Sequence, residues 1–523
     1  MPRPASTRAP LRLGGAVLGG VVAACVATAA GAQPAATIPT PPALAAIREA
    51  DLKRDLYAMA GDAMRGREAG TLDELRAAVW TAERAREAGL KPAGDDGTYF
   101  QWWPMRRVRL VPERSTAAAE RDGDRPLPLA WGREVVPAAP VEFSGALPLV
   151  ALAPGDTTTD VRGRAVVVDV RPPRALPPEG VSLRPYRYVL AAIREQSAPL
   201  LRRGAGAVVL VGDSTAEAAW DFAGVGLLRG RYNVDTAGAA AIPTGAPVLW
   251  VRAGVGTRLR DDARAGGRLR LSLAAESFVY PSANVVAVAP GRDPRLRGEY
   301  VLFSGHHDHD GVRNPVDVGG SGVSPRLDSI RNGADDNASV DVAILAAGRA
   351  FAKAPGRRSA LFVWHGAEER GLLGSRWFSA HPTVPRDSIV AVLNGDMVGR
   401  NNPDSAALLG AQPPHRNSSD LVAMALAANR LVGHFALDSL WDRPSHPEGW
   451  YFRSDHLPYA RLGVPAVMFT TLLHPDYHTV RDEPARIDYA KLTRMARWMY
   501  ATGWAVAERD RRPGTDPGFK LER

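Results

Sequence analysis

Cysteine is almost absent from this sequence, because Cys25 is the only one among 523 residues. A single cysteine cannot form a disulfide within the chain. The residues that follow Cys25 also contain no thiol that could act as a nucleophile. Any metal ion bound there must therefore be held by nitrogen and oxygen ligands.

Histidine is missing from the first 305 residues, and all eleven histidines lie at or after His306. Chance scatter does not produce that distribution, so the second half of the chain is where we expect imidazole chemistry. The sequence also has no internal repeats and no dense run of lysine and arginine interleaved with aromatic residues. Its formal charge of +9 is spread along the chain, which argues against a nucleic-acid partner.

What is present is enough for a large folded protein, since 45% of the residues are hydrophobic. A chain of this length is expected to form two or three domains. Residues 1–32 have a basic start, an uncharged stretch from 13 to 29, and the small-residue pattern Ala30-Gly31-Ala32. This pattern predicts a signal peptide cleaved before Gln33, and hence a secreted or periplasmic protein with no stable membrane span.

The N-terminal segment has two alternative interpretations. The uncharged stretch is nearly long enough to stay in a membrane as an uncleaved anchor, although its alanine and glycine content makes it poorly hydrophobic. The run Val22-Ala23-Ala24-Cys25 resembles the lipid-attachment box of bacterial lipoproteins, so Cys25 would then tether the protein to a membrane.

The middle of the chain differs in character from its two flanks. Residues 135–282 carry short β-branched runs that alternate with glycine and proline turns, and one helix is expected near residues 188–203. This pattern predicts an inserted, mostly β module with no acid and histidine cluster. From residue 283 strands alternate with helices up to a closing helix over 488–508, and residues 511–523 form a polar tail.

Four apolar runs in the last part of the chain predict buried strands, at residues 300–303, 360–364, 389–393 and 464–469. Polar motifs follow them, and one more lies between the first two runs. In chain order the motifs are His306-His307-Asp308, Gly333-Ala334-Asp335-Asp336-Asn337, Glu368-Glu369, Asn394-Gly395-Asp396 and Tyr477-His478-Thr479. Because the carboxyl ends of parallel strands open into one crevice, we expect these side chains to meet there.

Two histidines with several carboxylates form a donor set that suits zinc and leaves a position open for water. His306 is expected to bind metal, and Asp308 is expected to hold its second ring nitrogen. A two-metal site needs a bridging carboxylate, for which we select Asp336. In the pair Glu368-Glu369, one carboxylate would be a ligand and the other the general base that takes a proton from water.

These motifs, together with Ala367-Glu368-Glu369-Arg370-Gly371 and Ser454-Asp455-His456, closely resemble the secreted di-zinc aminopeptidase family. Glutamate carboxypeptidase and the transferrin receptor ectodomain are relatives of that family. The resemblance implies a three-layer α/β/α zinc-exopeptidase domain with a mixed central sheet. Its N-terminal part would be residues 33–134 and its catalytic part residues 283–510, while the insert, residues 135–282, is similar to a protease-associated domain.

The resemblance also implies a role for each site residue. His306 and Asp396 would bind one zinc ion, Glu369 and His478 would bind the other, and Asp336 would bridge the two. Glu368 would be the general base. Tyr477 is similar to a tyrosine that, in some members, donates a hydrogen bond to the tetrahedral intermediate.

The function implied by the resemblance is zinc-dependent removal of N-terminal residues from peptides, by attack of a water held between the metals. Two alternatives remain open: a carboxypeptidase or other amidohydrolase on the same scaffold, and a catalytically silent binding protein. One departure from the family pattern is Val340, which stands where the family often has glycine. A β-branched residue there narrows the backbone conformations near Asp336.

Overall fold

The structure is a computed structural model that describes residues 38–174, 181–220, 224–236, 242–312 and 328–523. The expected signal peptide over 1–32 and the alternative lipid attachment at Cys25 lie outside the described residues, so they stay predictions. In the ranges that the structure describes, none of the helices is both long and apolar enough to cross a membrane.

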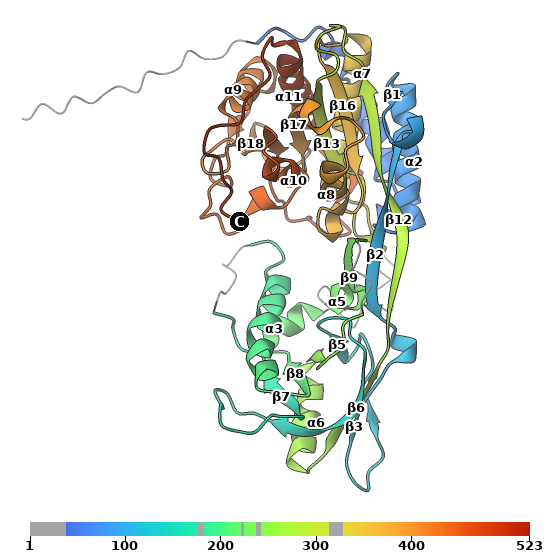
Figure 1. Cartoon of the computed structure of the whole chain (residues 1–523), viewed down its shortest axis with the longest axis vertical. Coiled ribbons are helices and arrows are strands. Elements are labelled where there is room, and N and C mark those ends of the chain that lie inside the picture. The colour runs from blue at the N-terminus through green and yellow to red at the C-terminus, as the bar shows by residue number, and fades with distance from the viewer. Residues whose placement is uncertain (1–37, 175–180, 221–223, 237–241, 313–327) are drawn as a thin grey trace, which may run out of the picture. The chain divides into compact units, whose positions relative to one another are not determined.

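A ten-stranded mixed sheet forms the centre of the catalytic part (Figure 1). In sheet order its strands are β19 (Ala436–Leu437), β18 (Ser405–Leu409), β20 (Ala466–Thr470), β17 (Ile389–Gly395), β13 (Tyr300–His306), β16 (Ser359–His365), β12 (Ala275–Ala289), β2 (Phe100–Leu110) and β9 (Arg231–Val234), with β1 (Lys91–Pro92) beside β12. The four predicted strands are β13, β16, β17 and β20, which lie next to one another and run parallel. Strand β12 joins them antiparallel.

Helices cover both faces of this sheet, which confirms the expected three layers. The helices packed on one face are α1 (Glu49–Met59), α2 (Leu72–Glu87), α7 (Ser339–Lys353), α9 (Ser419–Ala428) and α11 (Tyr489–Glu508). The other face carries α8 (Leu373–Ala380) and α10 (His456–Arg461). Successive strand residues serve opposite faces, as Leu302 and Phe303 do, and both are fully buried in separate clusters.

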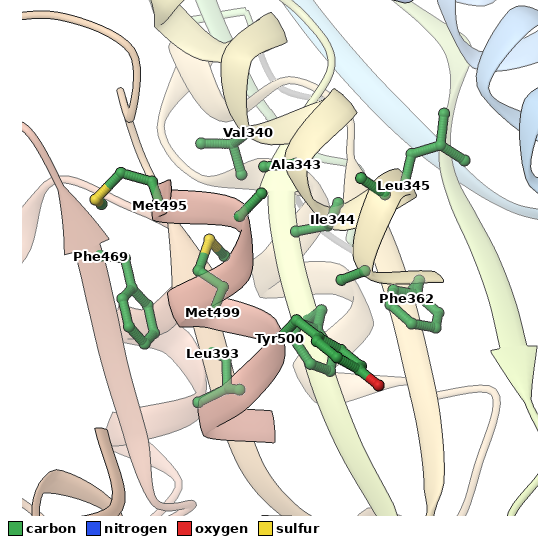
Figure 2. Packing of buried hydrophobic residues seen from close by; sticks show 14 of the residues in the cluster. Val340, Ala343, Ile344, Leu345, Phe362, Leu393, Phe469, Met495, Met499 and Tyr500 are labelled. Atoms are coloured by element: carbon green, nitrogen blue, oxygen red, sulfur yellow. The ribbon is translucent and has the colours of Figure 1, made fainter. Parts of the chain in front are cut away.

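Helices α7 and α11 pack directly on the central strands, as Figure 2 shows. Ile344 on α7 and Met499 on α11 are completely buried with Phe362 of β16 and Leu393 of β17. Each such side chain contributes roughly 1.5–3 kcal/mol through burial. The strand ends that carry the polar motifs are therefore anchored in a rigid core.

The insert has its own eight-stranded sheet. In sheet order the strands are β4 (Leu127–Pro128), β3 (Thr116–Glu120), β11 (Arg268–Leu273), β6 (Phe143–Ala151), β7 (Ala165–Asp169), β8 (Ala207–Val211), β10 (Val248–Val251) and β5 (Val135–Pro137). Helices α3 (Arg184–Arg202), α4 (Ser214–Ala218), α5 (Val225–Arg229) and α6 (Ala253–Arg264) accompany it. The sheet includes β3 and β4, which precede residue 135, the position predicted as the start of the insert. Similarity of this module to a protease-associated domain stays a prediction.

Candidate metal centre

The polar motifs meet at the carboxyl ends of the parallel strands. His306 is the last residue of β13, Glu368 and Glu369 follow β16, and Asp396 follows β17. The fifth residue, His478, lies beyond β20. Residues that are up to 172 positions apart in the sequence (306 to 478) are therefore brought to one edge of the sheet by the order of the strands and by the loops that follow them.

Two groups of side chains at this edge have the composition of metal sites. One consists of His306, Glu368 and Asp396, and the other of His309, Asp336, Glu369 and His478. Within each group the candidate ligand atoms all lie within 4.8 Å of one another. The five residues expected to bind metal all belong to these two groups, and so does the expected base Glu368.

Asp336 lies between the two groups. One of its carboxylate oxygens is 3.4 Å from Nε2 of His306, and the other is 3.2 Å from Nε2 of His478. Ligand atoms bound tetrahedrally to one zinc ion at 2.0–2.1 Å stand about 3.3 Å apart. The distance from each oxygen of Asp336 to the nearby histidine nitrogen is therefore close to the distance expected between two ligands of one zinc ion. Because the two oxygens face different histidines, Asp336 has the placement expected of a bridging carboxylate.

The imidazoles fit metal binding in a second respect. Nε2 of His306 and Nε2 of His478 are buried and, among the described residues, have no hydrogen-bond partner. A buried ring nitrogen without a partner is costly unless another group satisfies it. The carboxylates beside them supply negative charge that cations would neutralise, so the residues present fit divalent metal ions.

His478 is held by a carboxylate that sequence analysis did not select. Its Nδ1 lies 3.0 Å from Oδ2 of Asp310, and Asp310 in turn contacts Arg331 and Arg370. A carboxylate on the outer ring nitrogen fixes the tautomer that leaves Nε2 free for a metal. The contact joins residues 168 positions apart, and the only available signal was an acid two residues beyond Asp308.

Asp308 itself contacts the expected base and its neighbour. Its carboxylate accepts hydrogen bonds from the backbone N–H groups of Glu368 at 2.9 Å and Glu369 at 3.3 Å. Nδ1 of His306 is 3.2 Å from the backbone carbonyl oxygen of Asp308 and 3.7 Å from its carboxylate. The closest partner of the His306 ring is thus the carbonyl, while the side chain of Asp308 holds the two glutamates in place.

His309, which is not among the expected ligands, is completely buried in the same group as Asp336, Glu369 and His478. Its Nδ1 is 2.8 Å from Oε1 of Glu369, and Oε2 of Glu369 is 3.4 Å from Nε2 of His478. One carboxylate oxygen of Glu369 therefore contacts His309, and the other lies toward Nε2 of His478, where a metal ion could bind to both.

The electrostatics of the centre also favour cations. Burial and the neighbouring carboxylate of Asp336 raise the pKa of Asp396 to about 8. Burial raises the pKa of Glu368 well above its usual range against the opposing charge of His306, and nearby carboxylates such as Glu369 add to the rise. Metal binding to a protonated carboxyl group must release its proton, so we expect metal affinity to rise with pH.

The structure has room for valine at position 340, where the family that the sequence resembles often has glycine. Its side chain is fully buried and fills space left by Gly305 of β13 and Gly395 of β17. A Cβ atom at either glycine would come within 2.7 Å of Val340, which is closer than real Cβ contacts. The valine thus packs beneath the metal-binding edge, against two strand ends that have no side chain there.

Arg67 ties the loops of the centre together. It is completely buried and donates hydrogen bonds to the backbone carbonyls of Met59 at 3.0 Å, His307 at 2.8 Å, Asn332 at 2.6 Å and Gly333 at 2.9 Å. Three of these carbonyls lie close to candidate ligands, because His307 follows His306 and because Asn332 and Gly333 precede Asp336. One N-terminal arginine therefore fixes both backbone segments that present the first two ligands.

Replacing Arg67 with methionine should lower the free energy of unfolding by about 3 kcal/mol or more, because it leaves buried carbonyls without donors. Urea unfolding at a fixed metal concentration measures the change. Arg76→Met is the matched control, since Arg76 is half exposed and pairs with Asp73 on the surface. That pair is expected to contribute at most about 1 kcal/mol. Equal destabilisation by the two substitutions would contradict the role of Arg67.

A layered α/β fold that gathers imidazoles and carboxylates at the carboxyl ends of its parallel strands has a candidate metal centre at the edge where open α/β sheets bind ligands. The family comparison concerns the same part of the chain. Residues 284–503 match the model of peptidase family M28, and this segment contains every residue of the two metal-binding groups.

Curated relatives and solved structures extend the comparison. The chain is 33% identical over 125 residues to leupeptin-inactivating enzyme 1 of Streptomyces exfoliatus, which covers 23% of each protein. It is 25% identical over 248 residues to a probable leucine aminopeptidase of Trichophyton verrucosum, covering 46% of this chain and 61% of the relative. The chain thus matches less than two thirds of the length of these relatives.

Two solved structures share the fold over most of the chain. An aminopeptidase from Aneurinibacillus sp. strain AM-1 superposes with a TM-score of 0.54 at 17% identity, over 90% of this chain and 96% of that one. A zinc aminopeptidase from Bacillus subtilis gives 0.54 at 18% identity, over 92% and 100%. These likenesses concern the fold, and they confirm the expected mixed α/β architecture with an inserted second sheet.

Proposed function

We propose that this protein is a metallo-aminopeptidase that binds two zinc ions and hydrolyses the N-terminal peptide bond of its substrates. The observation that carries the proposal is the placement of Asp336, with one carboxylate oxygen toward His306 and the other toward His478. The match of residues 284–503 to peptidase family M28 supports the reaction class. The curated leucine aminopeptidase relative supports the choice of the amino end.

His306 and Asp396 would hold one zinc ion, Glu369 and His478 the other, and Asp336 both. When bound, such ions polarise a peptide carbonyl and lower the pKa of water toward about 7. Glu368 accepts the proton of the attacking water and passes it to the nitrogen of the leaving amine.

Tyr477 lines a cavity together with Glu368 and His478, and it supplies a hydrogen bond to the substrate. Burial raises the pKa of the Tyr477 hydroxyl well above its usual range, so the group stays protonated at neutral pH. It can therefore donate to the negative charge that develops on the substrate carbonyl oxygen.

A carboxypeptidase on the same scaffold is the second candidate, and one observation favours it. Arg229, Arg370 and Arg453 line the cavity that contains Glu368 and His478. Cationic side chains of this kind suit a substrate carboxylate.

The aminopeptidase and the carboxypeptidase can be distinguished by which of two substrates the protein hydrolyses. We expect an aminoacyl anilide with a free amine to be hydrolysed, and an N-blocked dipeptide with a free carboxylate to be left intact. A chelator should abolish turnover and added zinc should restore it. Hydrolysis of the blocked dipeptide alone would replace the aminopeptidase assignment with the carboxypeptidase, and turnover that is indifferent to chelators would overturn both.

A further inference from the structure

The insert supplies part of the wall of the candidate active site. A cavity of about 500 Å³ opens beside Glu368, Glu369, Tyr477 and His478. Residues of the insert and of β9 also line it, namely Leu183, Tyr186, Gly226, Arg229, Gly230 and Tyr232. A substrate bound at the metal centre would therefore lie against both parts of the chain.

Glu448 joins these two parts at the rim of the cavity. Its side chain is only 4% exposed and accepts hydrogen bonds from the Ser182 hydroxyl at 2.8 Å and from Arg187 at 2.7 Å, both in the insert. It also accepts one from Nη1 of Arg453 at 2.8 Å, in the catalytic part. The Ser182 hydroxyl lies 3.3 Å from the same Nη1 atom. A buried carboxylate with this many donors is fixed in position.

Arg453 continues the chain of contacts to Tyr477. Its Nη2 donates a hydrogen bond to the Tyr477 hydroxyl oxygen at 2.9 Å, and its guanidinium lies 4.4 Å from the ring centre of Trp450. The planar guanidinium is therefore held at Nη1 by Glu448, on its face by Trp450, and at Nη2 by Tyr477. Because the tyrosine oxygen accepts from an arginine, the hydroxyl proton is left to be donated elsewhere. A charged donor on that oxygen also makes the hydroxyl a better donor.

We propose that the insert is a working part of the active site, because Ser182 acts through Glu448 and Arg453 to position the Tyr477 hydroxyl toward the substrate carbonyl. Arg453, Glu448 and Ser182 are positioning residues in this relay, and Tyr477 alone touches the substrate. The inference rests on the proposed hydrolase function. It assigns to the insert a contribution to turnover itself, beyond that of a lid or a spacer.

A double-mutant cycle on the full-length, zinc-loaded protein tests the relay. Tyr477→Phe should lower kcat for an aminoacyl anilide about 100-fold, as for the loss of one oxyanion donor. Arg453→Met should lower kcat about 10-fold or more with little change in KM, because a group that aids only the transition state affects kcat. In the Tyr477→Phe background, Arg453→Met should have almost no further effect. Ser182→Ala should lower kcat a few-fold in the natural background and leave it unchanged in the Tyr477→Phe background.

Controls separate positioning from folding. Arg461→Met removes an exposed arginine of α10 and should leave kcat and KM unchanged. Arg453→Lys keeps the positive charge and should retain an intermediate kcat, which guards against misfolding of the methionine variant. Zinc content and thermal unfolding are measured for every variant, because a loss of turnover counts only where both stay normal.

Three results would overturn the relay. The first is a double variant whose fold-loss of kcat equals the product of the losses in Arg453→Met and Tyr477→Phe. The two residues would then act independently. The second is a rise in KM with unchanged kcat, which would make Arg453 a substrate-binding residue. The third is wild-type kcat in both single variants. Failure of the proposed function looks different, because the unmodified protein would then show no metal-dependent turnover at all.

Discussion

Glu368→Gln should lower kcat by about 10²- to 10⁴-fold, the usual contribution of a general base, while zinc content stays at the natural level. Glutamine keeps the shape of glutamate and cannot accept a proton from water. The backbone N–H of residue 368 donates to Asp308 regardless of the side chain, so the turn that carries it should keep its conformation. Steady-state kinetics on an aminoacyl anilide, with metal analysis of the same sample, measure both quantities.

The neighbouring acid provides the matched control. Oε2 of Glu369 is 3.4 Å from Nε2 of His478, and Oε2 of Glu368 is 3.7 Å from Nε2 of His306. Glu369→Gln should therefore weaken binding of one zinc ion, and part of its activity should return at high zinc concentration. Glu368→Gln should not be rescued by zinc. Near-normal turnover in Glu368→Gln would remove the base assignment, and zinc rescue of that variant would make Glu368 a ligand instead.

Part of this centre could be predicted from the sequence because its side chains lie at the ends of buried strands. The apolar runs that predicted β13, β16, β17 and β20 are long and free of charge, and buried parallel strands require that composition. The residues at the ends of such strands have to share one edge of the sheet, so the positions of His306 and Asp396 followed from strand order, while His478 lies farther along the loop after β20. Side chains whose position is set by the backbone were the predictable part.

Contacts made between loops could not be predicted in the same way. The pairing of Asp310 with His478 depends on how two loops cross in space, and no periodicity records it. The same holds for Arg67, whose hydrogen bonds reach backbone carbonyls more than 200 residues away. An arginine near the N-terminus carries no sequence signal that relates it to a metal centre.

The organisation of the insert was predictable only in outline. Its β-branched runs predicted strands, and β7, β8 and β10 occupy them. The addition of β3 to the same sheet depends on antiparallel pairing with β11, about 150 residues later in the chain. Residues 116–120 are mostly alanine, and such a run does not by itself favour a strand.

Asp336 faces a histidine of each candidate metal group, and this placement leads to the largest expected effect of any single substitution. One carboxylate oxygen of Asp336 lies near His306 and the other lies near His478, whereas Asp396 is grouped with His306 and Glu368 only. Loss of a bridging carboxylate removes a ligand from both ions and also removes the negative charge that separates them. Substitution of a bridging residue and substitution of a ligand to one ion should therefore leave different numbers of bound zinc ions per protein.

Asp336→Ala should bind neither zinc ion tightly, whereas Asp396→Ala should lose one and keep the other. Both variants should lose turnover, so the decisive measurement is zinc content after dialysis, with calorimetric titration of the metal-free protein. Because a ligand that binds only the folded state stabilises it, zinc should raise the unfolding temperature of the natural protein and of Asp396→Ala, but not that of Asp336→Ala. Two equivalents of tightly bound zinc in Asp336→Ala would show that this carboxylate is not the bridge, and the assignment of the centre would then have to be rebuilt around Glu369 and Asp396.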